Sequence, residues 1–319
     1  MKLNKIKLAL GLVAGFAVAA PMVASAAADQ EKAIADANNW AHPRGNHSNN
    51  AHSALTQINK GNVKNLKAAW TFATGVNRGH EGSPLVVGST MYVHTAFPNN
   101  VYALDLNNDQ KIVWSYFPKQ DPSVQAVLCC DNVNRGLGFG DGKIFLQQND
   151  GIMVALDAKS GKEVWTAQIT DPKVGATNTS APHVIKDKVL QGCSGAEFGV
   201  RCFFTALNTK DGSVAWKAYS TGPDKEVLIG KDFNKDTPLY SALSVYEDVN
   251  GGNKQGGSFK KVPTDKLQGG VADLGLKTWL KPQAVKDGWQ HGGGSVWGWW
   301  PYDAKTNLVY YGTGNPSVW

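Results

Sequence analysis

The sequence predicts an all-β fold, specifically a β-propeller, on three observations. Thirty-five glycines and eleven tryptophans among 319 residues indicate a turn-rich β protein with large aromatic side chains between its sheets. A pattern of strand, turn and Trp-containing strand recurs along the chain. Its tryptophans lie 44, 51 and 51 residues apart, about the length of one four-stranded blade, at Trp70, Trp114, Trp165 and Trp216.

Each full repeat begins with a strand that ends in Ala-Leu-Asp or Ala-Leu-Asn, at 103–105, 155–157 and 206–208. A turn with Gly or Asn follows, because these residues adopt the positive φ angles of tight hairpins. The Trp-containing strand comes next, and we expect its tryptophan to fill the space between neighbouring blades. Alternating runs at 91–94 and 143–146 predict further strands. A β-sandwich is the alternative, and three copies in register disfavour it.

The repeats account for about four blades. Trp70 marks a copy that lacks its first half, and residues 302–307 begin another. Closed propellers have four to eight blades, and an incomplete blade leaves an open strand edge. We therefore expect residues 27–319 to be the N-terminal part of a longer propeller. Residues 219–290, rich in Lys, Gly and Asp, predict an insertion over one face.

Residues 1–26 have the pattern of a secretory signal peptide. A basic start with three lysines precedes an apolar run, and Ala24-Ser25-Ala26 provides the cleavage site. The exported domain then lies in a compartment where disulfides persist. No later segment is apolar enough to predict a transmembrane helix. We therefore expect a periplasmic protein without a transmembrane segment.

The charge pattern argues against a nucleic-acid partner. The formal net charge of +6 falls to +3 once the three lysines of the signal segment are set aside. No block of lysine and arginine of the kind that binds nucleic acid is present.

The four cysteines form two close pairs. Cys129 and Cys130 are adjacent, and neighbouring Cα atoms lie about 3.8 Å apart, whereas a relaxed disulfide needs roughly 4.4–6.8 Å. These two residues either pair elsewhere or form a strained ring at a functional site. Cys193 and Cys202 bracket the sequence S-G-A-E-F-G-V-R. Four cysteines allow three pairings, and two buried free thiols remain an alternative for the second pair.

Five motifs are candidates for a site, and they recur about once per blade near turns and strand ends. Each residue alone is more simply a turn or surface residue, but together they could converge on one end of a central channel. A flat anionic ligand there would use aromatic, cationic and hydroxyl contacts. Glu197 and Asn315 offer oxygens suited to a hard cation. The motifs are 79–82, 129–135, 179–182, 193–201, and 296–300 with 312–316.

These motifs resemble those of the PQQ-dependent (quinoprotein) alcohol dehydrogenases of the methanol/ethanol dehydrogenase family. The resemblance extends from about Trp40 to Trp319. It implies an eight-bladed propeller, about half of it present here, with the quinone near the axis. The motifs stand in the family order as R-G-H-E-G, C-C-D-x-V-N-R-G, S-G-A-E-x-G-V-R, W-G-W and G-T-G-N-P.

The resemblance also assigns roles to individual residues. Trp297 is expected to lie under the quinone ring, with a Cys129–Cys130 disulfide above it, and together with that pair we favour a disulfide between Cys193 and Cys202. Glu197 and Asn315 match the ligands of a Ca²⁺ or lanthanide ion. The residues that match cofactor-binding positions are Glu81, Cys129, Cys130, Arg135, Thr179, Ser194, Gly195, Ala196, Glu197 and Trp297.

The activity implied by the resemblance is oxidation of a small primary alcohol, with methanol to formaldehyde preferred and ethanol or longer alcohols as alternatives. Hydride passes to the metal-bound PQQ, and a periplasmic cytochrome c accepts the electrons. The family's catalytic aspartate lies downstream of G-T-G-N-P, beyond residue 319, so we expect this chain alone to be inactive. Residues 226–230 and 290–297 favour the lanthanide type. The full-length form is compatible with a homodimer.

Two other functions are compatible with parts of the sequence. A non-enzymatic periplasmic β-propeller scaffold has similar Trp-containing repeats but no need for C-C, S-G-A-E or G-T-G-N-P. A sugar-oxidising relative would use the same cofactor, but the adjacent cysteines and W-G-W favour alcohol oxidation over it.

Overall fold

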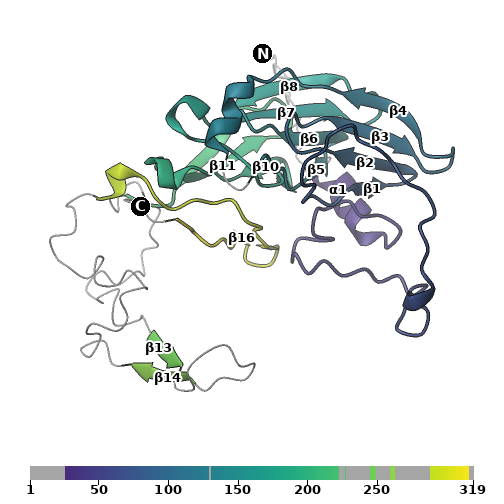
Figure 1. Ribbon diagram of the computed structural model, residues 1–319, viewed down its shortest axis with the longest axis horizontal. Helices are drawn as coiled ribbons and strands as arrows, with labels where there is room; N and C mark the ends of the chain where they lie inside the picture. The colour runs from purple at the N-terminus through teal and green to yellow at the C-terminus, as the bar shows by residue number, and fades with distance from the viewer. Residues whose placement is uncertain are drawn as a thin grey trace, which may run out of the picture.

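Three four-stranded antiparallel sheets follow one another along the chain, and the strands of each sheet pair in sequence order. The computed structural model describes residues 26–128, 131–222, 227, 245–248, 259–262 and 288–315. Figure 1 shows helix α1 beside β1 and β5, on the side of the sheets away from β4 and β8. This arrangement confirms the predicted all-β fold and the repeat.

The elements have the following bounds. The first sheet contains β1 (Leu85–Val87), β2 (Thr90–His94), β3 (Val101–Asp105) and β4 (Lys111–Tyr116). The second contains β5 (Leu137–Gly140), β6 (Lys143–Gln147), β7 (Ile152–Asp157) and β8 (Glu163–Gln168). The third contains β9 (His183–Ile185), β10 (Lys188–Gln191), β11 (Phe203–Asn208) and β12 (Val214–Tyr219).

Shorter elements complete the described chain. Strand β13 (Val245–Asp248) pairs with β14 (Phe259–Val262), and β15 (Tyr302–Asp303) pairs with β16 (Leu308–Val309). The one α-helix among the described residues is α1 (Ala26–Ala35). The 3₁₀ helices are η1 (Val63–Asn65), η2 (Pro122–Val127), η3 (Pro172–Val174), η4 (Ala196–Phe198) and η7 (Gly288–His291).

Two of the repeat tryptophans join neighbouring sheets, as the repeat predicts. The Nε1–H of Trp114 in β4 donates to the carbonyl of Ala158, at 3.1 Å. The Nε1–H of Trp165 in β8 donates to the carbonyl of Thr209, at 2.9 Å. Each acceptor directly follows the Ala-Leu-Asp or Ala-Leu-Asn end of the next sheet's third strand. The tryptophan of one repeat therefore binds the turn of the next and sets the spacing between sheets.

The core lies between the sheets, where apolar strands face one another. One buried cluster joins β1, β2 and β3 of the first sheet to β5, β6 and β7 of the second, with Leu85, Leu137 and Leu156 fully buried. A second cluster joins Phe145 and Met153 of the second sheet to Val184 of the third. Burial of apolar area contributes about 25 cal/mol per Å², so these layers hold the sheets in a fixed order.

The segment at Trp70 differs from the prediction of about four blades. Trp70 lies outside any strand and is 40% exposed. Elsewhere in the chain, a Trp-containing strand pairs with the third strand of its own sheet. Residues 26–65, which precede Trp70, contain no strand that could act as this partner. The described residues therefore form three complete sheets.

Several predictions fall largely outside the described residues. These are the signal peptide, of which residues 1–25 are not described, most of the insertion at 219–290, and the Cys129–Cys130 disulfide. Among the residues that are described, no helix has the length and apolar character needed to cross a membrane.

Candidate functional site

Three predicted site residues lie shortly before the first strand of each sheet. Glu81 precedes β1, Arg135 precedes β5, and Thr179 precedes β9. Backbone contacts align these segments: Ser83 forms a parallel bridge with Gly136, and the N–H of Arg135 donates to the carbonyl of Thr179, at 3.1 Å. Residues 54 and 44 positions apart in sequence are thereby brought to one end of the three sheets.

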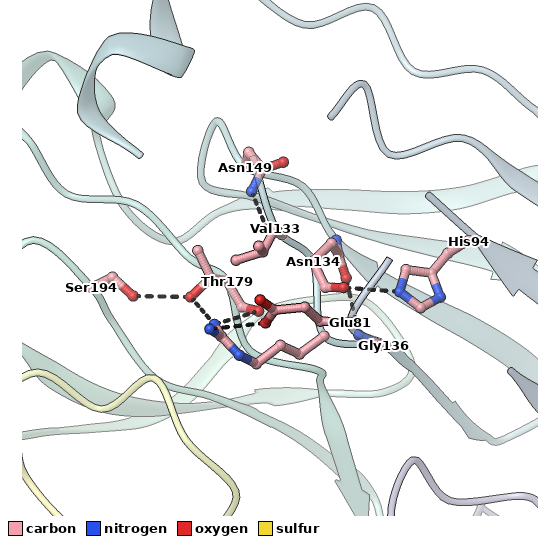
Figure 2. Close-up of polar contacts among 9 residues, drawn as sticks. Glu81, His94, Val133, Asn134, Gly136, Asn149, Thr179 and Ser194 are labelled. Atoms are coloured by element: carbon pink, nitrogen blue, oxygen red, sulfur yellow. Dashed lines mark hydrogen bonds and ion pairs between the residues drawn. The ribbon is translucent and has the colours of Figure 1, made fainter. Parts of the chain in front are cut away.

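The side chains of these residues form one polar chain. Arg135 Nη2 lies 3.1 Å from Glu81 Oε2, and Arg135 Nη1 donates to Thr179 Oγ1, at 2.7 Å. Thr179 Oγ1 lies 3.5 Å from Ser194 Oγ, as Figure 2 shows. We call Glu81, Arg135, Thr179 and Ser194 the polar chain. It presents a guanidinium and two hydroxyls side by side, which is a donor set suited to carboxylate or carbonyl oxygens.

Close packing of the backbone makes this convergence feasible. Gly136 has φ of +150°, and a Cβ there would lie 2.9 Å from the Cβ of Ala181. A larger residue would push the segment before β5 away from the segment before β9. Glycine at this position therefore lets Arg135 reach Thr179.

Trp297 places an indole next to the polar chain. The guanidinium carbon of Arg135 lies 5.2 Å from the centroid of the Trp297 ring, within the range of a cation–π contact. Trp297 is 42% exposed, whereas Val296 and Trp300 of the same segment are each 1% exposed. Trp300 packs on His183 of β9 with ring centroids 4.9 Å apart. Buried neighbours thus hold the segment while the side chain of Trp297 stays partly exposed.

A hollow adjoins this indole. Its volume is about 240 Å³, and residues 295–300 and 311–314 line it. The two segments pair through a bridge between Ser295 and Gly314, and the N–H of Gly294 donates to the carbonyl of Asn315, at 3.2 Å. Asn315 is thereby tied to the segment that contains Trp297.

Glu197 and Asn315 meet although 118 residues separate them. The Asn315 Nδ2 donates to Glu197 Oε2, at 3.0 Å. Asn315 has φ of +53°, a conformation that asparagine tolerates better than most residues. No group of three or more His, Cys, Asp or Glu side chains suited to a metal occurs within the described part of the chain. A hard cation needs six to eight oxygens, so one bound here would take most of its ligands from a cofactor, water or backbone.

The disulfide between Cys193 and Cys202 closes the loop that contains Glu197. The two Cα atoms lie 5.4 Å apart, and both residues are fully buried. This confirms the predicted pairing of these two cysteines. The N–H of Val296 donates to the carbonyl of Cys193, at 2.8 Å, so the loop and the Trp297 segment are joined as well.

Gly195 and Ala196 contribute backbone rather than side chain to this loop. Gly195 has φ of +105°, and a Cβ there would overlap the carbonyl of Gly175. Ala196 is fully buried in a cluster with Cys193, Cys202 and Phe203. Ser194 forms a two-bond bridge with Thr177, which fixes its hydroxyl near Thr179.

The structure therefore brings the predicted residues together in two groups, the polar chain with Trp297 and the pair of Glu197 with Asn315. Residues 194–197 connect the two groups along the chain. Cys129 and Cys130 lie outside the described residues.

A buried histidine near the polar chain was not among the predicted residues. Burial lowers the pKa of His94 to about 4, against the opposing effect of its hydrogen bond to the backbone of Asn134. The imidazole is therefore neutral at pH 7. Tyr92 and His94 occupy alternate positions of β2 and are both buried, so the strand pattern could indicate that His94 faces inward. The pattern could not indicate which residues His94 would contact.

Comparisons with known proteins agree with this arrangement. The family model described as "PQQ: glucose/ethanol/alcohol dehydrogenase, beta-propeller domain" matches residues 40–227. The chain is 47% identical over 310 residues to a lanthanide-dependent methanol dehydrogenase of Methylorubrum extorquens, which covers 97% of this chain and 46% of that protein. It is 47% identical over 288 residues to methanol dehydrogenase [cytochrome c] subunit 1 of the same organism, covering 88% and 41% respectively.

Among solved structures, a europium-containing methanol dehydrogenase superposes with a TM-score of 0.74 at 44% identity. The match covers 91% of this chain and 44% of that one. This chain thus spans less than half of the length of these relatives. Since the family model matches more than half of the present chain, the chain belongs to the family of PQQ-type glucose/ethanol/alcohol dehydrogenase β-propeller domains.

Proposed function

We propose that this chain forms a PQQ and metal site in a periplasmic enzyme that oxidises small primary alcohols, with methanol as the preferred substrate. The observation that best supports the proposal is the contact of the polar chain with the partly exposed Trp297, together with the Glu197–Asn315 pair. The names of the methanol dehydrogenase relatives support the substrate class. Ethanol and longer primary alcohols are the alternative substrates.

The donor set fits a planar anionic quinone. Arg135 and the hydroxyls of Thr179 and Ser194 would bind its oxygens, and the indole of Trp297 would stack on its ring. Glu81 holds the guanidinium of Arg135 in place through the 3.1 Å ion pair. When bound, PQQ supplies a two-electron acceptor for the alcohol.

Glu197 and Asn315 would bind the cation beside the quinone. A carboxylate and an amide oxygen are hard ligands, which suit Ca²⁺ or a lanthanide ion. The lanthanide-dependent and europium-containing relatives favour a lanthanide. The cation would replace the amide N–H of Asn315 as the partner of the Glu197 carboxylate. The loop closed by the Cys193–Cys202 disulfide would restrict the position of this carboxylate.

The electron acceptor proposed is a cytochrome c, because one relative is named for that acceptor.

Equilibrium binding tests the proposal. PQQ should quench tryptophan fluorescence of the chain, and Ca²⁺ or La³⁺ should strengthen the binding. The Glu197→Gln variant should weaken metal-dependent PQQ binding at least roughly tenfold, because it removes a charged ligand. Glu163→Gln, at an exposed carboxylate of β8, is the matched control and should bind as the unmodified chain does. Absence of PQQ binding, or equal binding by both variants, would overturn the proposal.

A further inference from the structure

We propose that His94 is a positioning residue for this site. It contacts the backbone next to Glu81 and Arg135 and so holds the two segments that contain these residues. The inference rests on the proposed function, in which Arg135 binds the quinone and Glu81 holds the guanidinium of Arg135 in place. His94 itself touches neither the polar chain nor Trp297 in any contact found among the described residues.

The contact with the Arg135 segment is a buried hydrogen bond. His94 is the last residue of β2 and is 4% exposed. Its Nε2 lies 3.1 Å from the carbonyl oxygen of Asn134, the residue directly before Arg135, as Figure 2 shows. Since a carbonyl only accepts, the Nε2 of the neutral ring must carry the proton and donate. Nδ1 is then an unprotonated, buried nitrogen with no hydrogen-bond partner in the described part of the chain.

The contact with the Glu81 segment is close van der Waals packing. A Cβ on Gly82, the residue directly after Glu81, would overlap the imidazole of His94. The same Cβ would lie 2.9 Å from the carbonyl carbon of Arg135. The ring of His94 therefore occupies the space between the two segments whose side chains form the Glu81–Arg135 ion pair.

His94 completes a set of four hydrogen bonds along Val133–Gly136. Asn149 Nδ2 donates to the carbonyl of Val133, at 3.0 Å, and His94 donates to that of Asn134. The N–H of Arg135 donates to the carbonyl of Thr179, and the N–H of Gly136 donates to the Oδ1 of Asn134, at 3.1 Å. The backbone on both sides of Arg135 is thus held in one position before any ligand arrives, which favours binding by preorganisation.

A neutral donor suits this position. Burial holds the pKa of His94 near 4, so the ring adds no positive charge behind Arg135 at pH 7. A cation there would repel the guanidinium and compete with it for Glu81. His94 supplies the hydrogen bond and the bulk without changing the charge of the site.

Three variants test the proposal. His94→Leu keeps much of the volume and removes the donor, whereas His94→Gln places an amide N–H within reach of the same carbonyl. Tyr92→Phe, on the same strand, removes a buried hydrogen bond from the Tyr92 hydroxyl to the carbonyl of Ala158, 3.1 Å long and unconnected with the polar chain. PQQ affinity in the presence of La³⁺ is measured together with urea unfolding.

His94→Leu should weaken PQQ binding roughly threefold to tenfold, the effect of one buried hydrogen bond. His94→Gln should stay within about twofold of the unmodified chain. Tyr92→Phe should lose stability as His94→Leu does and keep its PQQ affinity. The inference is overturned if His94→Leu binds PQQ normally, if His94→Gln fails equally, or if Tyr92→Phe loses the same affinity.

Hydrogen exchange gives a second measurement that needs no PQQ. Amides of residues 131–137 should exchange roughly fivefold faster in His94→Leu and at the normal rate in Tyr92→Phe, since one hydrogen bond of the set is lost. If the unmodified chain binds no PQQ, the proposed function fails, and this exchange rate still decides whether His94 holds the segment. Unchanged exchange in His94→Leu would refute the positioning role by itself.

Discussion

Removal of the Cys193–Cys202 disulfide should lower both the stability of the chain and its affinity for metal. The perturbation is the double variant Cys193→Ala/Cys202→Ala. The bond links residues nine positions apart, and the chain-entropy model assigns a closed loop of about ten residues roughly 3 kcal/mol of stability. Both cysteines are fully buried, so the free energy of unfolding should fall by at least this amount.

The second effect follows from what the loop contains. Glu197 lies between the two cysteines, and its carboxylate meets Asn315 from 118 residues away. A loop that is no longer closed must be ordered when the cation binds, and the affinity falls accordingly. Lanthanide affinity should therefore weaken at least roughly tenfold, which corresponds to about half of the lost stabilisation.

Urea unfolding without reductant measures the first effect, and Tb³⁺ luminescence titration measures the second. A loss of about 3 kcal/mol should lower the melting temperature by roughly 6–12 °C for a domain of this size. A reductant should shift the unmodified chain toward the double variant. If the double variant unfolds at the same urea concentration as the unmodified chain, the loop-closure reasoning is wrong. If stability falls and Tb³⁺ affinity does not, the loop does not position Glu197.

Two further predictions concern the fold. Trp165→Phe removes the indole donor to the Thr209 carbonyl and should cost about 1 kcal/mol in urea unfolding, whereas Trp216→Phe, at a tryptophan that is 42% exposed, should cost less than about 0.5 kcal/mol. Equal costs would contradict a special role for the tryptophan between sheets. Burial lowers the pKa of His94 to about 4 and that of His183 to about 3, so below pH 6.5 the unfolded chain binds more protons than the folded chain. Stability should be constant above pH 6.5 and fall as the pH drops toward 4, by up to roughly 3 kcal/mol for His94 alone. Unfolding free energies at pH 7, 5.5 and 4.5 check this. If the His94→Gln variant loses as much stability with falling pH as the unmodified chain does, the assignment to His94 is refuted.

The repeat could be predicted because its information is local. Alternating apolar residues, an Ala-Leu-Asp or Ala-Leu-Asn end and a Gly-containing turn determine a hairpin within about fifteen residues. The structure has β3 and β4, β7 and β8, and β11 and β12 where the sequence predicts them. The copy at Trp70 failed to form a strand because a strand needs a hydrogen-bonding neighbour, which a Trp-containing sequence does not itself provide.

The site residues could be predicted only in part. Motif resemblance identified Glu81, Arg135 and Thr179, but nothing in their spacing shows that each precedes the first strand of a sheet. His94 escaped prediction because a buried histidine at a strand end is ordinarily a core residue. The positioning role proposed for His94 rests on its contacts with Gly82 and Asn134, which belong to two other segments of the chain.

By itself, then, the sequence determined the all-β repeat and the tryptophans between sheets, and through a family resemblance its motifs suggested the candidate site residues and a disulfide between Cys193 and Cys202. Only the tertiary structure decided which side chains meet, in what order, and which buried neighbours hold them. The physical reason is the range of the interactions. Turn chemistry and strand alternation act between residues close in sequence. The contacts of Arg135 with Glu81 and Thr179, and of Glu197 with Asn315, join residues 44 to 118 positions apart and exist only once the sheets have packed.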